Sequence, residues 1–183
     1  PRENAPMAEM MQDTPAAIAA LPESGKLILR ADADNADIRA AIGGVLTAPL
    51  PVEPLTSMAG DKATALWLGP DEWLLLCAEA DRAGLQQALE TALASQHASV
   101  VDVSDSYQGF SVTGPKAADL LSKGCAIDLH PVAFGEGKVV RTLLAKADIT
   151  LLRIEAGFQL YVLRSFAEYT RLWLDDAGRE YRG

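Results

Sequence analysis

The sequence predicts an α+β fold made of two similar halves, each a β-α-β-β-α unit, related by an internal pseudo-twofold. Apolar strand-like runs alternate with amphipathic helical segments along the 183 residues. The order strand, helix, strand, turn, strand, helix then occurs twice, so that 27–46 corresponds to 110–124 and 65–94 to 149–177. A sheet with helices on one side is typical of the α+β class, because each element buries one face against the other.

The first half begins with a strand and a capped helix. Its predicted strands are 26–30, 63–68 and 73–77, and a second helix is predicted at 82–94. Asn35 or Asp34 can cap the first helix, whose apolar positions are spaced i, i+3, i+4, i+7 and i+8 from Ile38 to Leu46. Three prolines between 49 and 54 predict an extended connection up to Gly60, since proline fixes φ and lacks a backbone N–H.

The second half repeats this order. Its predicted strands are 100–103, 108–113, 139–144, 149–154 and 158–163. A helix is predicted from Pro115 to Gly124, with the glycine as its C-terminal cap. Ser165 and Glu168 have the spacing of a capping box at the start of the last helix. That helix carries Phe166, Tyr169 and Trp173 on one face.

The N-terminal residues differ from the rest of the chain. Residues 1–24 show no sustained period and are predicted to form a loosely ordered arm. Residues 25–183 are predicted to form one domain of two halves, about 25–97 and 98–183. The first 22 residues lack the basic and apolar regions of a secretory signal. Two cysteines are also too few for a disulfide scaffold, so we expect a cytoplasmic protein.

The charge balance excludes several classes of partner. Sixteen lysines and arginines face 25 aspartates and glutamates, which gives a net charge of −9. Nucleic-acid binding needs clustered cations that displace counterions from phosphates, and an anionic membrane surface attracts basic segments. No apolar run approaches the roughly 20 residues of a membrane helix. The composition therefore favours an acidic, soluble protein that binds neither nucleic acid nor membrane.

The chemically capable side chains form no recognisable active site. The candidates are His97, His130, Cys77, Cys125, the cluster Asp32, Asp34 and Asp37, and the pair Asp102 and Asp105. Neither histidine has a nucleophile or an orienting carboxylate signature, and the acidic cluster lacks the glycine and distal glutamate of a calcium loop. The Asp102/Asp105 pair suits either acid–base chemistry or a turn. We predict no catalytic, cofactor-binding or metal-ligating residue in this chain.

Three stretches carry a resemblance to a known family. They are 64–76, 101–105 running into 112–131, and 158–169, and the segment KGCAIDLHP within the second is the most specific. Together they resemble the gamma-subunit family of heterotetrameric sarcosine oxidase across about 25–180. The Thr-Gly-Pro-x-x-x-x-Leu-Leu motif at 113–121 is shared with the wider aminomethyltransferase folate-binding superfamily. The duplicated α+β fold of that superfamily agrees with the repeat described above.

The resemblance implies a non-catalytic structural subunit of a heterotetramer. In that family the complex oxidatively demethylates sarcosine to glycine, transfers the one-carbon unit to tetrahydrofolate and forms hydrogen peroxide. FAD, FMN, NAD and the tetrahydrofolate site belong to the alpha and beta subunits, and zinc belongs to the delta subunit. The gamma subunit packs mainly against alpha and carries no cofactor. This hypothesis predicts an exposed apolar patch on the isolated chain.

A second hypothesis comes from the superfamily. The chain would be a stand-alone folate-binding or one-carbon-transfer domain, with a deep pocket in which one carboxylate reads the pterin. Asp102 and Asp105 are the candidate carboxylates for that role, without a motif to support either. A regulatory adaptor without an enzyme partner is the remaining alternative.

Overall fold

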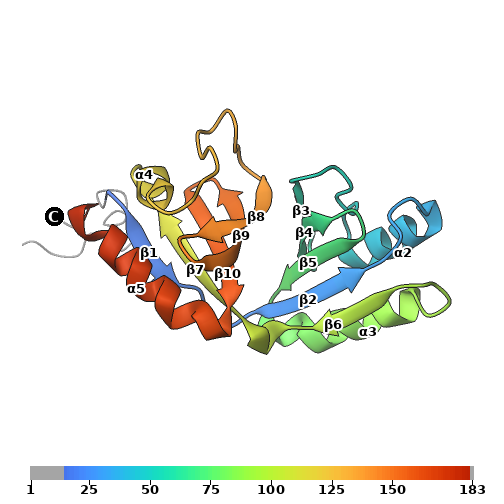
Figure 1. The fold of residues 1–183 in the computed structure, drawn as a ribbon. Coiled ribbons are helices and arrows are strands. Elements are labelled where there is room, and N and C mark those ends of the chain that lie inside the picture. Colours follow the sequence, from blue (N-terminus) through green and yellow to red (C-terminus); the bar gives the residue numbers. More distant parts are fainter. Residues whose placement is uncertain (1–14, 182–183) are drawn as a thin grey trace, which may run out of the picture. The chain divides into compact units, whose positions relative to one another are not determined.

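The computed structural model describes residues 15–181, which form two compact units. Within the described residues, unit 1 takes 15–21, Gln108–Glu136 and 141–181. Unit 2 takes Pro22–Tyr107 and Gly137–Val140. Each unit contains one five-stranded antiparallel sheet and two of the helices (Figure 1). The predicted α+β class is therefore confirmed.

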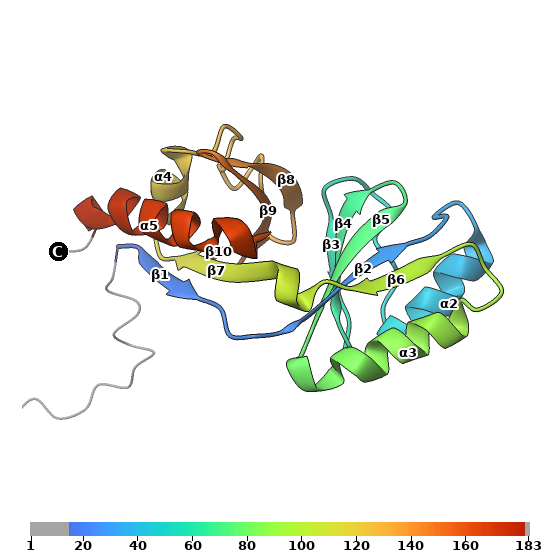
Figure 2. The same ribbon diagram turned by 60° about the horizontal axis from the view of Figure 1, so that its bottom comes forward.

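Unit 2 is built from the first half of the sequence. Its elements are β2 (Gly25–Arg30), α2 (Ala36–Leu46), β3 (Ser57–Ala59), β4 (Thr64–Gly69), β5 (Glu72–Cys77), α3 (Arg82–Ala92) and β6 (Ser99–Asp102). The strands lie in the order β3-β4-β5-β2-β6, and α2 and α3 cover one face of the sheet (Figure 2). Leu27 and Leu29 alternate along β2 and are fully buried with Trp73, Ile42 and Leu89 in the core.

Unit 1 follows the same plan. Its elements are β1 (Ala17–Ala20), β7 (Tyr107–Thr113), α4 (Ala117–Ser122), β8 (Val139–Leu144), β9 (Ala147–Ile154), β10 (Gly157–Leu163) and α5 (Ala167–Ala177). Its sheet has the order β1-β7-β10-β9-β8. Helices α4 and α5 contact each other and both contact β10, so they lie on one face of this sheet. Val112, Leu120, Phe158, Leu160 and Leu174 are completely or almost completely buried in this unit.

In each sheet the fifth strand comes from outside the run of consecutive elements that supplies the other four strands. In each sheet four strands come from one β-α-β-β-β-α run, and the fifth strand lies beside the first strand of that run. In unit 2 this strand is β6, which follows the run and pairs antiparallel with β2, placing Asp102 opposite Leu27. In unit 1 it is β1, which precedes the whole of unit 2 in the sequence and pairs with β7, placing Ala17 opposite Thr113. The chain therefore crosses from one unit to the other before the first β-α-β-β-β-α run and again after it.

The structure differs from the prediction at the N-terminus and at the unit boundary. Part of the predicted arm, 1–14, lies outside the described residues, but Ala17–Ala20 forms β1 rather than a loosely ordered segment. The units also differ from the predicted halves 25–97 and 98–183, because β6 pairs with the first half. The short strand β3 lies in the expected extended connection and adds a third consecutive strand to the unit.

The helix ends confirm one predicted cap and correct two others. The side chain of Asn35 accepts hydrogen bonds from the backbone N–H groups of Asp37 and Ile38, at 2.9 and 3.3 Å. The capping box at Ser165 and Glu168 is wrong, because α5 begins at Ala167 without a side-chain cap and Glu168 pairs with an arginine instead. Helix α4 begins two residues after Pro115, and Lys123 occupies its C-terminal cap position with right-handed backbone geometry.

Gly124 has a packing role rather than the predicted capping role. It is not among the described glycines with positive φ, so it does not need glycine's conformational freedom. A Cβ at this position would overlap the indole ring of Trp173 in α5. The missing side chain therefore lets α5 approach the end of α4.

We predict that Gly124→Ala destabilises the protein by about 1–3 kcal/mol, since the added methyl group overpacks a filled contact. Gly44→Ala is the matched control, because Gly44 lies within α2 and a Cβ there meets nothing within 4 Å. We expect the control to stabilise the protein by about 0.5–1 kcal/mol through helix propensity. Urea denaturation at pH 7 measures both changes. Equal midpoints for Gly124→Ala and wild type would contradict the packing role.

Candidate functional site

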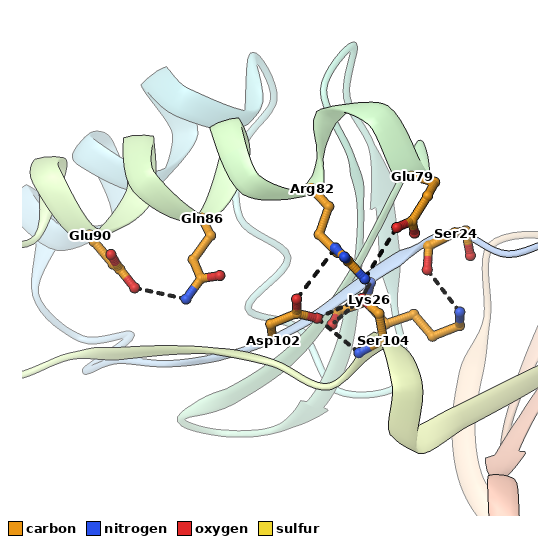
Figure 3. Close-up of polar contacts among 8 residues, drawn as sticks. All are labelled: Ser24, Lys26, Glu79, Arg82, Gln86, Glu90, Asp102 and Ser104. Atoms are coloured by element: carbon orange, nitrogen blue, oxygen red, sulfur yellow. Dashed lines mark hydrogen bonds and ion pairs between the residues drawn. The ribbon is translucent and has the colours of Figure 1, made fainter.

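Asp102, one of the two candidate pterin-reading carboxylates, anchors a polar network within unit 2 (Figure 3). Its Oδ1 accepts hydrogen bonds from Ser104, from the backbone N–H at 2.9 Å and from the hydroxyl at 2.6 Å. Its Oδ2 lies 3.4 Å from Nε of Arg82, whose Nη1 lies 3.2 Å from Oε1 of Glu79. The carboxylate thus fastens the end of β6 to the first turn of α3.

Ser104 joins this network to the interior strand β2. It is buried in the 3-10 turn Ser104–Ser106, and its hydroxyl accepts a hydrogen bond from the backbone N–H of Lys26 at 2.9 Å. The backbone N–H of Val103 donates to the Lys26 carbonyl at 2.9 Å, and Lys26 Nζ donates to the Ser24 carbonyl at the same distance. These bonds continue the pairing of the chain with β2 beyond the end of β6.

The environment of Asp102 favours its ionised form. Burial raises the pKa of Asp102. The hydrogen bonds from Ser104 and the charges of Arg82 and Lys26 lower this pKa by more than burial raises it, so the net shift is downward. Two donors already occupy Oδ1, and Arg82 lies beside Oδ2. The contacts described for Asp102 hold backbone and side chains of its own unit. These contacts attach the end of β6 to the turn that follows it and to α3.

Asp105, the other candidate carboxylate, is exposed in the same 3-10 turn. Neither Asp102 nor Asp105 lines the three cavities of the described chain that are considered below. None of these three cavities is therefore the deep pocket, with Asp102 or Asp105 as its carboxylate, that the folate-binding hypothesis predicts.

Both cysteines are buried and free within the described chain. Burial raises the pKa of the Cys77 thiol, and the carboxylates of Asp81, Glu79 and Asp102 raise it further. A thiol in this environment stays protonated, which opposes a nucleophilic role. Cys125 follows α4, and its backbone N–H donates to the Leu121 carbonyl at 2.9 Å.

The largest of the three cavities lies in unit 1 and has a volume of about 630 Å³. His130, Asp128 and Arg153 are among its lining residues. The Asp128 carboxylate accepts from the backbone N–H of His130 at 2.9 Å, and His130 Nδ1 accepts from the N–H of Val132 at 3.3 Å. The Arg153 guanidinium lies 4.5 Å from the ring centroid of Phe158. Ser122 also lines this cavity, and its hydroxyl donates to the Ala118 carbonyl at 2.7 Å.

His97 lies in a second cavity of about 470 Å³, at the edge of unit 2, together with Arg30, Asp32 and Asp71. Arg30 pairs there with Asp71 at 3.5 Å. The third cavity, of about 320 Å³, lies between α2 and α3 and contains Lys62 and Asp81.

The acidic cluster at 32–37 forms a turn and a helix start. Asp32 Oδ1 accepts from the backbone N–H of Asp34 at 2.9 Å, and Asp37 lies in the first turn of α2, where a carboxylate is favourable. Over residues 15–181 no three histidine, cysteine or acidic side chains gather in a way that could hold a metal ion. In the same range no helix is long and apolar enough to cross a membrane.

The sequence predicted an exposed apolar patch but not its location, which the structure shows. The patch consists of Leu163 at the end of β10, Phe166 in the 3-10 turn that follows, and Tyr169 and Leu172 on the outer side of α5. The predicted aromatic face of this helix is divided: Phe166 and Tyr169 are exposed, whereas Trp173 packs against Gly124. Leu174 is fully buried and lies on the inner side of α5. Taking Leu174 as the inner position, the helical period alone would have predicted which residues lie on the outer side.

The fold of the described chain is found in a known class of proteins. Its TM-score is 0.67 to the crystal structure of glycine cleavage system aminomethyltransferase T from Bartonella henselae, with 12% sequence identity, over 90% of this chain and 46% of that chain. At this identity the likeness concerns the fold alone. Residues 30–180 match the model of the sarcosine oxidase, gamma subunit family, and the chain belongs to that family.

Individual relatives agree with this membership. The chain is 34% identical over 165 residues to sarcosine oxidase subunit gamma of Arthrobacter sp., covering 90% of this chain and 79% of the relative. It is 38% identical over 127 residues to the corresponding subunit of Corynebacterium sp. (strain U-96), covering 68% of this chain and 61% of the relative. A chain of heterotetrameric sarcosine oxidase from Corynebacterium sp. U-96, in complex with pyrrole 2-carboxylate, is 33% identical with a TM-score of 0.84. That match covers 92% of this chain and 86% of the other.

We predict that Ser104→Ala destabilises the protein by about 1–3 kcal/mol, because it leaves the buried N–H of Lys26 without its acceptor. Ser106→Ala is the matched control in the same turn, where the side chain is exposed. We expect the control to change the free energy of unfolding by less than about 0.5 kcal/mol. Urea denaturation at pH 7 compares the two. Equal losses would contradict the role of the Ser104 hydroxyl.

The stabilisation by Asp102 should depend on pH. Its folded-state pKa is lowered, so its contribution is present above the unfolded-state pKa of about 3.9 and is lost as the pH falls through the folded-state value. About a third of the side chain is exposed (35%), so we expect Asp102→Asn to cost no more than about 1 kcal/mol at pH 7. The difference from wild type should shrink below about pH 4 in urea titrations. A difference that stays constant from pH 7 to pH 3 would refute this assignment.

Proposed function

We propose that this chain is a non-catalytic structural subunit of a heterotetrameric sarcosine oxidase. The observation that carries the proposal is the agreement, at a TM-score of 0.84 and 33% identity over 92% of this chain, with a chain of such an oxidase. The complex would oxidatively demethylate sarcosine to glycine, pass the one-carbon unit to tetrahydrofolate and reduce dioxygen to hydrogen peroxide.

The catalytic groups of this complex would lie on other subunits. FAD, FMN, NAD and tetrahydrofolate would be held by alpha and beta, and zinc by delta, in a cytoplasmic assembly where this chain packs mainly against alpha. The contacts of Asp102 and Cys77 support a structural role, because the carboxylate binds groups of its own unit and the thiol is held protonated. The exposed apolar patch is the feature that a partner-binding subunit needs.

The internal duplication belongs to the same proposal. Both sheets combine a β-α-β-β-β-α run with a fifth strand beside its first strand, which supports two repeats related by a pseudo-twofold. The duplicated fold would be the part that this family shares with the aminomethyltransferases.

The alternative is a stand-alone folate-binding or one-carbon-transfer domain. The fold likeness to aminomethyltransferase T favours it. Asp102 would then have to leave the hydroxyl of Ser104 and the guanidinium of Arg82 to read a pterin, at the cost of the contacts that fasten β6. We therefore place this function second.

We predict that the tagged chain, expressed with its chromosomal neighbours, recovers large partner chains and a yellow eluate. The eluate should produce hydrogen peroxide in a sarcosine-dependent reaction, because the flavins arrive with the partners. The tagged chain expressed alone is the control, and its eluate should be colourless. An absorbance spectrum and a peroxidase-coupled assay measure both properties.

A colourless lone chain from the co-expression would contradict the subunit assignment. A tetrahydrofolate titration of the purified chain would then test the alternative, with Asp102→Asn compared against Glu90→Gln on the exposed side of α3. Saturable binding that only Asp102→Asn removes would establish the folate-binding domain.

A further inference from the structure

The exposed apolar patch gathers four large side chains from the end of β10 to the middle of α5. The exposed fractions are 43% for Leu163, 41% for Phe166, 37% for Tyr169 and 54% for Leu172. Phe166 ends the 3-10 turn that leads into α5, and Tyr169 lies three residues from both Phe166 and Leu172, so it neighbours each of them on the helix surface. The rings of Phe166 and Tyr169 meet edge to face, with centroids 6.3 Å apart. Single exposed apolar residues are ordinary, but four in one place mark an interaction surface.

Helix α3 provides an internal control for this interpretation. It holds the same place in unit 2 that α5 holds in unit 1, after the last strand of the β-α-β-β-β-α run. Its exposed positions are Ala83, Gly84, Gln87, Ala88, Glu90, Thr91 and Ala92. No large hydrophobic residue of α3 is exposed. The fold itself therefore does not require bulky apolar side chains on the outside of this helix.

The charges beside the patch are satisfied by one another. Arg171 donates to the carboxylate of Glu168 at 3.0 and 2.8 Å and to that of Asp175 at 2.8 Å. Arg179 pairs with Asp176 at 3.1 Å. From 163 to 179 three arginines face three carboxylates, so this surface is neutral on a chain whose net charge is −9. A complementary surface needs no charge of either sign, and it gains from being apolar.

We infer that the patch formed by Leu163, Phe166, Tyr169 and Leu172 is the surface by which this chain docks on an uncharged, apolar face of a larger subunit of the oxidase. This inference rests on the proposed function and specifies the surface that it uses. The paired rings of Phe166 and Tyr169 form the centre of the contact, where aromatic anchors contribute most to binding. The ion pairs of Arg171 form its polar rim.

A second copy of this chain is a poorer occupant than a different subunit. Each of two copies would carry a net charge of −9 over the whole chain, and like net charges oppose association. A partner without that acidic excess meets the neutral patch at no such cost. A membrane is also a poor occupant, because the patch has no excess of basic residues to attract anionic lipids.

The test compares Phe166→Glu and Leu172→Glu with Val132→Glu in the co-expressed complex. Val132 is 90% exposed in unit 1 and does not belong to the patch, so it controls for placing a charge on an exposed apolar residue. We expect each patch variant to reduce the amount of partner chains retained by the tagged chain about tenfold or more, since it buries a charge at the contact. The control should retain as much partner as wild type.

Two measurements on the isolated chain complete the test. The urea midpoints of the patch variants should equal that of wild type, because both side chains are exposed in the free chain. If either variant unfolds early, Phe166→Gln and Leu172→Gln replace them in the same pull-down. Light scattering with size-exclusion chromatography measures whether wild type is a monomer, as we expect.

The outcomes separate this inference from the proposed function. If wild type retains its partners and folded patch variants retain them equally well, the docking surface is wrong and the subunit assignment stands. If wild type retains no partner, the proposed function fails and the inference fails with it. A wild-type dimer that Phe166→Glu converts to a monomer would make a second copy the occupant and overturn the inference.

Discussion

The pairing of each sheet with a strand from beyond its own β-α-β-β-β-α run is the constraint on which the rest of the structure depends. Strand β2 is hydrogen-bonded to β5 on one side and to β6 on the other, which places Leu27 and Leu29 on an interior strand rather than on an edge strand. Strand β1 gives β7 its second neighbour in unit 1. Without these two short strands, the first strand of each run would have an unpaired edge beside a buried core.

The polar network around Ser104 belongs to the same constraint. Strand β6 is only four residues long, so its own hydrogen bonds attach only a short segment of the chain to β2. The Ser104 hydroxyl and the backbone of Val103 extend that attachment by two further bonds to Lys26, and Asp102 adds a link to α3. The Asp102 carboxylate fixes the strand near the point where the chain leaves unit 2. Its lowered pKa follows from this structural use.

The sequence predicted elements whose pattern is local and missed those that depend on distant pairing. Helix α2 could be predicted because its apolar period and the Asn35 cap lie within a dozen residues. Strand β1 could not, since Ala17–Ala20 has no alternating pattern and becomes a strand only beside β7, about 90 residues away. The pair Asp102 and Asp105 was correctly placed near a strand end, but its partners Ser104 and Arg82 are set by tertiary structure. For the same reason, the helical period showed aromatic residues near α5, but only packing against Gly124 separates the half-buried Trp173 from the exposed Phe166.

The strand exchange has a consequence for the history of the chain. On the proposed duplication, one ancestral repeat would have consisted of an edge strand followed by one β-α-β-β-β-α run. In the present chain neither edge strand lies in the sheet of the run that follows it, because β1 pairs with the second run and β6 with the first. Two separate copies would each have completed the sheet of the other, as in a strand-swapped homodimer. Fusion of the two genes would then have turned an obligate dimer into a single chain, and each copy would afterwards have been free to change its surface independently. The outer sides of α3 and α5 differ in the way such independence allows, since α3 exposes small and polar residues and α5 exposes Tyr169 and Leu172.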